Sequence, residues 1–170
     1  MLTLRPLSNA DQAATYFERD DYYVTGAQAV PSSWWGKGAA RLRLRGDVER
    51  DAFADLLHGR LPNGDVLVHG RGDKHHPGLD LTFSAPKSVS LVALVAGDQR
   101  VLSAHERAVS IALEYLEQTA ARTRSTKDGL AQIERTDNLV VARFTHDSSR
   151  ELDPQLHTHC VVLNVTQRDD

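Results

Sequence analysis

Hydrophobic and polar residues follow two different periods along the chain. From Leu79 to Ser84 apolar and polar residues alternate, which predicts a β-strand with one apolar face and one polar face. From Asp98 to about Arg124 apolar residues recur at every third or fourth position, which predicts a long amphipathic helix. The residues on the apolar side of that helix are Leu102, Val109, Leu113, Leu116 and Ala120.

Capping and turn residues mark the remaining elements. Ser8 has the chemistry of a helix N-cap, with Asp11 three residues later, and Tyr16 falls in the last turn of the helix that follows. Pro86 starts another helix, which is expected to end near Gly97. Short helices are predicted at 38–44 and 48–57, and β-rich runs at 130–146 and 156–166. The pattern predicts an α+β fold, an antiparallel β-sheet with helices packed on one side.

The size and charge of the chain limit its function classes. With 170 residues, 41% of them hydrophobic, it is long enough for one domain with a substantial core and short for two. Its formal net charge of −3 argues against a polycation that coats nucleic acid without selectivity. A nucleic-acid site would therefore be local. Basic clusters such as Arg122, Arg124 and Lys127 are candidates, with an ordinary solvated surface as the alternative.

Cysteine content and the lack of long apolar segments bear on location. The chain has one cysteine, Cys160, so no disulfide can form within it, which fits a reducing compartment. Strand alternation turns Cys160 away from His157 and His159, which predicts a buried apolar residue rather than a metal ligand. The N-terminus lacks the apolar run of a signal peptide, and no segment approaches the roughly 18 apolar residues of a membrane span. We expect a soluble protein of the bacterial cytoplasm.

Three of the eight histidines lie close together, in the segment HDSSRELDPQLHTH. His157 and His159 would share one face of a strand, with Cα atoms roughly 6.6 Å apart. His146 could supply a third nitrogen from a neighbouring strand. Three neutral imidazoles would leave nearly the full charge of a divalent ion to face an anionic phosphodiester. The alternative is that these histidines are unrelated. The others are predicted to be surface or loop residues: His58, His69, His75, His76 and His105.

Asp80 and three tyrosines are further candidates for chemistry. A carboxylate on the polar face of the 79–84 strand can orient an imidazole or accept a proton, although spacing alone favours a residue satisfied by backbone donors. Tyr16, Tyr22 and Tyr23 lie within eight positions. Such a cluster is usually packing with hydrated hydroxyls, but a tyrosine can also attack phosphorus. Ionising a hydroxyl of ordinary pKa near 10 at pH 7 takes roughly 4 kcal/mol, which a divalent cation or a carboxylate base could provide.

Four segments, in the same order, resemble the conjugative relaxases of the TrwC/TraI (MobF) type, within the HUH superfamily of tyrosine endonucleases. They are the N-terminal tyrosine cluster, WWGKGAARL, LDLTFSAPKSVSL and FTHDSSRELDPQLHTHCVVLNVT. The resemblance spans essentially the whole chain and implies a palm-type relaxase sheet. It also implies a reaction, metal-dependent, site- and strand-specific DNA nicking at a plasmid transfer origin. A tyrosine breaks the strand, leaves a 5′-phosphotyrosine and a free 3′-hydroxyl, and so initiates conjugative transfer.

The resemblance also implies roles for individual residues. Tyr16 matches the first catalytic tyrosine, and Asp80 matches the acidic residue that orients a ligand histidine and assists deprotonation. The implied metal ligands are His146, His157 and His159. Many members carry two adjacent tyrosine pairs, whereas this chain has Phe17 in the first pair. A second transfer would fall to Tyr22 or Tyr23.

The same resemblance implies the cofactor and the partners. Mg²⁺ or Mn²⁺ is the expected ion, with Zn²⁺, Ni²⁺ or Cu²⁺ as alternatives. The expected partners are single-stranded DNA at a transfer origin, accessory relaxosome proteins and coupling proteins. From the residues themselves, Lys87 would contact phosphate, and Trp34 or Trp35 would stack on bases. A solvated lysine and tryptophans in the core are the alternatives.

Family relaxase domains run on past the point at which this chain ends. Residues 1–170 are therefore expected to form a single, incomplete relaxase domain. Two other functions stay open. One is a truncated or degenerate fragment that binds metal and single-stranded DNA without cleavage, and the other is a metal-dependent phosphoesterase in which water replaces tyrosine.

Overall fold

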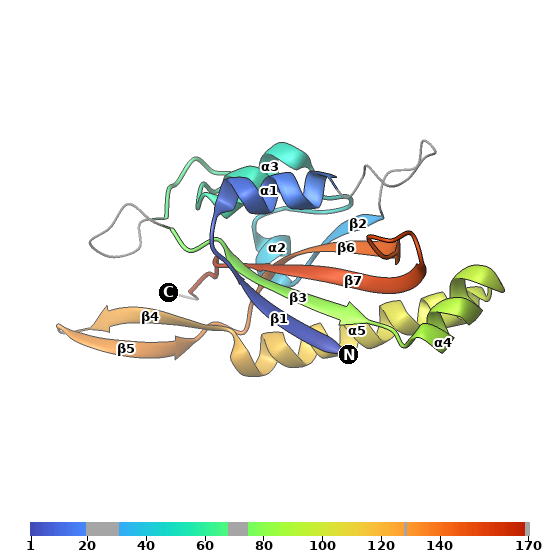
Figure 1. Ribbon diagram of the computed structural model, residues 1–170. Helices are drawn as coiled ribbons and strands as arrows, with labels where there is room; N and C mark the ends of the chain where they lie inside the picture. The colour runs from blue at the N-terminus through green and yellow to red at the C-terminus, as the bar shows by residue number, and fades with distance from the viewer. Residues whose placement is uncertain (20–30, 68–74, 128, 169–170) are drawn as a thin grey trace.

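A five-stranded antiparallel sheet is the centre of the fold. The computed structural model describes residues 1–19, 31–67, 75–127 and 129–168. The strand order is β1-β3-β7-β6-β2 (Figure 1). The strands are β1 (Leu2–Leu7), β2 (Ser32–Trp35), β3 (Gly78–Ser84), β6 (Val140–Ser148) and β7 (Pro154–Leu163). The predicted α+β class with an antiparallel sheet is confirmed, although the sequence predicted neither β1 nor β2 as a strand.

Helices cover both faces of this sheet, so the prediction that they pack on one side is wrong in that detail. One face carries α1 (Ala10–Arg19), α2 (Lys37–Arg41) and α3 (Arg50–Leu57), and α5 (Gln99–Ala120) crosses the other (Figure 1). The reason lies in the central strands β6 and β7. Residues 140–142 are all apolar and fully buried, so side chains on both faces of β6 need cover.

Each face of the sheet has its own cluster of buried side chains. Phe53 of α3 belongs to the cluster under α1, α2 and α3, and its ring meets Phe144 of β6 edge-on at 5.4 Å between centroids. Val109 and Leu113 of α5 belong to the cluster on the opposite face. These two residues confirm the predicted apolar side of α5, whereas Ala120 is exposed.

α5 ends earlier than predicted, and the chain continues as a separate hairpin. The hairpin consists of β4 (Arg122–Lys127) and β5 (Leu130–Arg135), and it stands away from the main sheet (Figure 1). The β-rich run predicted at 130–146 is therefore two strands in different sheets. They are separated near Asp137, which has a positive φ of 50°. Thr123 and Thr126 favour a strand locally, which the helical period running into this segment concealed.

Two helix boundaries illustrate the capping chemistry. Asn9, rather than Ser8, caps α1, because its Oδ1 accepts the backbone N–H three residues later at 3.0 Å. The helix predicted after Pro86 is confirmed as α4 (Lys87–Ser90), which continues into a π-helical turn and ends before Gly97, where φ is +70°. None of the helices in the described ranges is long and apolar enough to cross a membrane.

The WWGKG segment, which spans the end of β2 and the start of α2, lies against the chain just before β6. Gly36 has a φ of +104°, and a Cβ there would lie 2.3 Å from the carbonyl oxygen of Leu139, so the position requires glycine. The buried carboxylate of Glu117 accepts the backbone N–H groups of Lys37 at 2.8 Å and Leu139 at 3.0 Å. This interaction fixes α5 to both segments.

Candidate active site

Strand register brings the three predicted histidines together. His146 on β6 stands directly opposite His157 on β7, and His159 stands opposite Thr82 on β3. The ring centroids are 5.0 Å apart for His146 and His157, 5.4 Å for His146 and His159, and 5.2 Å for His157 and His159. The three rings project from the face that carries α1. Their convergence is confirmed, while their role as metal ligands stays a prediction.

His146 differs from the other two histidines in its hydrogen bonding. Its Nε2 atom is buried and has no hydrogen-bond partner among the described residues. Burial lowers the pKa of His146 from 6.5 to about 3, and the neighbouring rings of His157 and His159 act in the same direction. The ring is therefore neutral at physiological pH, and a buried imidazole nitrogen without a partner is costly unless something binds it.

Asp80 holds one of these imidazoles. Its carboxylate is buried, and the Nδ1–H of His159 donates to it at 3.0 Å and 2.9 Å from the two oxygens. The hydroxyl of Thr82 donates to the same carboxylate at 3.2 Å. The interpretation favoured by spacing alone, a residue satisfied by backbone donors, is wrong. Asp80 and His159 are diagonal neighbours on adjacent strands, a relation that exists only once β3 pairs with β7.

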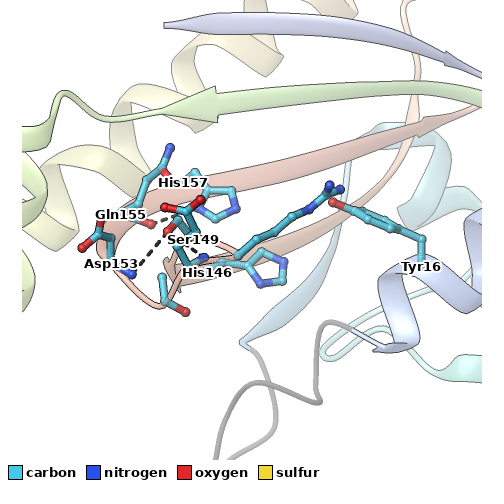
Figure 2. Close-up of a pocket in the computed structure, with 9 residues that line it drawn as sticks. Tyr16, His146, Ser149, Asp153, Gln155 and His157 are labelled. Carbon is cyan, nitrogen blue, oxygen red and sulfur yellow. Dashed lines mark hydrogen bonds between the residues drawn. The ribbon is translucent and has the colours of Figure 1, made fainter.

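α1 carries Tyr16 to the edge of the histidine cluster. Ala13 and Ala14 are buried against the sheet, and these small side chains let the helix lie close to it. Tyr16 is in the last turn of α1, as predicted. Its ring is 37% exposed and meets the ring of His159 edge-on at 6.1 Å between centroids. From α1, Tyr16 points across the cleft toward the side where His146 and His157 lie (Figure 2).

Two adjoining clefts open onto these residues. One, of about 520 Å³, lies between Tyr16 and the loop that joins β6 to β7. The other, of about 550 Å³, runs along α1 and β1 and reaches Asp80 and His159. Four described residues line both clefts, namely Tyr16, Arg150, Gln155 and His157. The two clefts together offer an extended ligand a continuous path past the tyrosine and the histidines.

Arg150 is a residue of this site that the sequence reasoning missed. It lies in the β6–β7 loop, and its guanidinium carbon is 6.0 Å from the centre of the Tyr16 ring. Its position in the sequence could have indicated this role, because Arg150 is the one arginine between His146 and His157.

Thr158 and His105 form a contact that was not predicted from the sequence, on the face of the sheet opposite the histidine cluster. Thr158 alternates with His157 and His159 and therefore faces α5, where its hydroxyl lies 3.0 Å from Nε2 of His105. Burial lowers the pKa of His105. The prediction that His105 is a surface or loop residue is wrong, because the helical period of α5 turns it toward the sheet.

The three residues predicted to contact DNA have other partners. Lys87 donates to the carbonyl oxygen of Pro154 at 3.1 Å and lies 3.6 Å from the Asp153 carboxylate, so it anchors the β6–β7 loop. Trp34 and Trp35 are half-buried and pack against the clusters on opposite faces of the sheet. Both tryptophans therefore pack against the core and neither lines the two clefts, while their contact with DNA stays a prediction.

Several other residues named from the sequence lie away from the clefts or outside the described residues. Cys160 is fully buried as predicted, and burial raises the pKa of its thiol to about 12, which opposes a ligand role. His58 contacts Asp11 at 2.9 Å and joins α3 to α1. Tyr22 and Tyr23 lie outside the described residues, as does His69.

The histidine cluster fits a metal ion in its donor chemistry. Nδ1–H of His157 donates to the carbonyl of Gln155 at 2.9 Å, and Nδ1–H of His159 donates to Asp80. Each donation places the lone pair of a neutral ring on Nε2. A ring whose nitrogen lies about 2.1 Å from an ion has its centre about 3.2 Å from it, so three such rings lie about 5 Å apart.

The rings are not already in coordinating orientation. Among the described side chains, no group of three or more His, Cys, Asp or Glu residues is set to hold an ion. The rings of His146 and His157 lie 20° from parallel, so their nitrogens do not aim at one point. Rotation about the broad terminal torsion of histidine would be needed.

A histidine cluster on an antiparallel sheet, faced by a tyrosine on a covering helix, is the arrangement that the resemblance to tyrosine endonucleases implies. The TrwC relaxase family matches residues 10–170. The chain therefore belongs to the TrwC relaxase family. It is 47% identical over 172 aligned residues to the multifunctional conjugation protein TraI of Escherichia coli, and 45% identical to TraI of strain K12. These alignments cover 99% of this chain and 10% of each relative.

Solved relaxase structures resemble the fold over its whole length. The metal-bound conjugative relaxase TrwC in complex with oriT DNA matches with a TM-score of 0.87 at 47% identity, as does a copper-bound structure of that complex. A metal-free TrwC structure with oriT DNA matches with a TM-score of 0.86 at 44% identity. The matches cover all of this chain and 59%, 59% and 58% of those chains. This chain thus spans less than two thirds of the proteins it resembles.

Proposed function

We propose that this chain nicks one strand of DNA at a transfer origin, in a metal-dependent and site-specific reaction, with Tyr16 as the nucleophile. The observation that carries the proposal is the meeting of a tyrosine from α1 with three histidines from β6 and β7 in one pair of clefts. Family membership supports the reaction type, because the similar TrwC structures are complexes with oriT DNA. The nick would initiate conjugative transfer.

The reaction is a transesterification at phosphorus. The Tyr16 oxygen forms a bond to phosphorus, and the bond from phosphorus to the 3′ oxygen breaks, with its electron pair left on that oxygen. The phenolic proton leaves Tyr16, and the 3′ oxygen gains a proton. One phosphoester bond replaces another, so the 5′-phosphotyrosine keeps the energy needed to rejoin the strand without a nucleotide cofactor.

His146, His157 and His159 would hold the divalent metal. When bound, the ion supplies Lewis-acid polarisation of the phosphodiester. Asp80 fixes the tautomer of His159 that offers Nε2, and its further role as a proton acceptor is part of the proposal. Mg²⁺ or Mn²⁺ is the proposed ion, although imidazole ligands also suit Zn²⁺, Ni²⁺ and Cu²⁺.

Single-stranded DNA is the proposed partner, with accessory relaxosome and coupling proteins. The β4–β5 hairpin supports a second contact with DNA, because Arg122 and Arg124 are exposed on one face of this protruding ribbon. Residues 1–170 are proposed to act as one unit of a longer relaxase domain located in the cytoplasm.

Adduct formation tests the nucleophile directly. The protein is incubated with Mn²⁺ and a labelled single-stranded oligonucleotide carrying the cognate origin, found by tiling the DNA around its own gene. We expect a covalent protein–DNA adduct, which Tyr16→Phe abolishes. Tyr115→Phe is the matched control, because Tyr115 is exposed on α5, on the opposite face of the sheet. Equal adduct from Tyr16→Phe would refute the assignment.

The same assay separates the alternatives. Free 5′-phosphate product without an adduct would indicate a phosphoesterase that uses water. Binding of metal and oligonucleotide without any cleavage would indicate a fragment that binds but does not cut.

A further inference from the structure

We propose that Arg150 is a catalytic residue, which binds a non-bridging oxygen of the scissile phosphate while Tyr16 attacks it. The inference rests on the proposed nicking function and assigns it a residue beyond the tyrosine, the aspartate and the histidines.

The loop that carries Arg150 is held in one shape. The Ser149 hydroxyl accepts the backbone N–H groups of Glu151 and Asp153, both at 3.2 Å. The backbone N–H of Ser149 donates to the carbonyl of Asp153 at 2.8 Å, which closes the loop. Lys87 holds the same loop from outside. Arg150 is therefore presented from a fixed turn, whose hydrogen bonds limit the backbone freedom that a long side chain would otherwise add.

The position of Arg150 matches that of a phosphate ligand. Its guanidinium carbon is 6.0 Å from the Tyr16 ring centre, and the same ring is 6.1 Å from the ring of His159. Arg150 and His159 therefore both lie beside the side chain whose hydroxyl would attack the phosphate. Arg150 also lines both clefts, so a strand that follows either one passes it.

Charge singles out Arg150 among its neighbours. Of the four described residues that line both clefts, Arg150 has the one permanent positive charge, the others being Tyr16, Gln155 and His157. The nearby loop residues Glu151 and Asp153 are acidic, and Lys87 lies 3.6 Å from the Asp153 carboxylate, so Arg150 adds the positive charge that faces the cleft itself.

The chemistry requires a group of this kind. As the bond from Tyr16 to phosphorus forms and the bond to the 3′ oxygen breaks, negative charge stays on the non-bridging oxygens. A guanidinium donates two parallel N–H bonds to such oxygens and never gives up its proton. Arg150 therefore stabilises charge and transfers no proton, which leaves the atom balance of the reaction unchanged.

The test compares Arg150→Gln with the parent chain in single-turnover adduct formation, with Mn²⁺ and saturating cognate-origin oligonucleotide. We expect the rate to fall about 10²- to 10³-fold, as when one preorganised donor is removed from other active sites. Arg150→Lys should recover part of the rate, because lysine restores the positive charge but not the two parallel N–H donors of a guanidinium. Arg100→Gln, which removes an exposed arginine from α5 on the opposite face, should match the parent.

A stereospecific substrate distinguishes phosphate binding from a structural role. Oligonucleotides are prepared with a methylphosphonate at the scissile position, as separate Rp and Sp isomers, each lacking one non-bridging oxygen. For one isomer, the difference between parent and Arg150→Gln should shrink to less than about tenfold, because the oxygen that Arg150 binds is gone. For the other isomer the difference should persist.

The results that would contradict the role of Arg150 differ from the result that would contradict the nicking function. Equal rates for the parent and Arg150→Gln on the natural phosphate, or equal losses with both isomers, would overturn the role of Arg150 while leaving the nicking function intact. Failure of the parent chain to form any adduct would overturn the proposed function and this inference with it.

Discussion

Burial of His146 predicts how the stability of the metal-free protein depends on pH. The pKa of His146 falls from 6.5 to about 3 on folding, so between these values the unfolded chain binds a proton that the folded chain does not. Stability is therefore lost as the pH falls below 6.5. pH 5 lies 1.5 units below the unfolded-state pKa of 6.5. At about 1.36 kcal/mol per unit, the free energy of unfolding is therefore lower by about 2 kcal/mol at pH 5.

Replacing the ring removes this dependence. His146→Asn cannot titrate, so its free energy of unfolding should fall by about 2 kcal/mol less than that of the parent between pH 7 and pH 5. Urea unfolding followed by circular dichroism, with a chelator present, measures both curves. Titration of the carboxylates is common to both proteins and cancels in the comparison.

The control is His76→Asn, which removes an exposed histidine outside the site. It should follow the parent curve. Parallel losses of stability in the parent and in His146→Asn would refute the argument from burial. A confirmed difference would mean that His146 is already neutral at physiological pH, so that an ion can bind it without displacing a proton.

Two further predictions concern the metal ligands and the ribbon. Asp80→Asn should lower the affinity for Mn²⁺ about 10- to 100-fold in calorimetric titration, because the tautomer of His159 is no longer fixed; an unchanged Kd, or an equal loss in the surface control Asp55→Asn, would contradict this role. Arg122→Gln combined with Arg124→Gln should reduce the salt dependence of single-stranded oligonucleotide binding, by about 0.7 in the log–log slope for each DNA phosphate that the protein no longer neutralises. An unchanged slope would show that the ribbon does not touch DNA phosphates.

Some features of the fold were predictable because they depend on neighbours in sequence. The β3 strand, the helix after Pro86 and the apolar side of α5 at Val109 and Leu113 follow from local period and turn residues. The boundary of α5 was not predictable in this way. Its helical period runs into the β4 strand, and pairing with β5 decides the outcome.

The candidate site divides along the same line. In a strand, residues two positions apart lie on the same face, so the spacing of His157 and His159 places both on one face. The family motifs point to Tyr16 and Asp80. The hydrogen bond between Asp80 and His159, by contrast, depends on the register of β3 against β7. Spacing alone favoured the wrong interpretation there, because the two residues are 79 positions apart in the chain.

The sequence by itself determined the chemistry available to this protein: a tyrosine on a helix, three histidines and a carboxylate, each in an element of recognisable period. Only the tertiary structure decided which of them meet. It placed His105 between α5 and the sheet and Lys87 against the β6–β7 loop. It packed the half-buried tryptophans against the two buried clusters, and it brought Arg150 beside Tyr16. The physical reason is that side-chain type and local period are written along the chain, whereas distances across strands and loops arise only from packing and register.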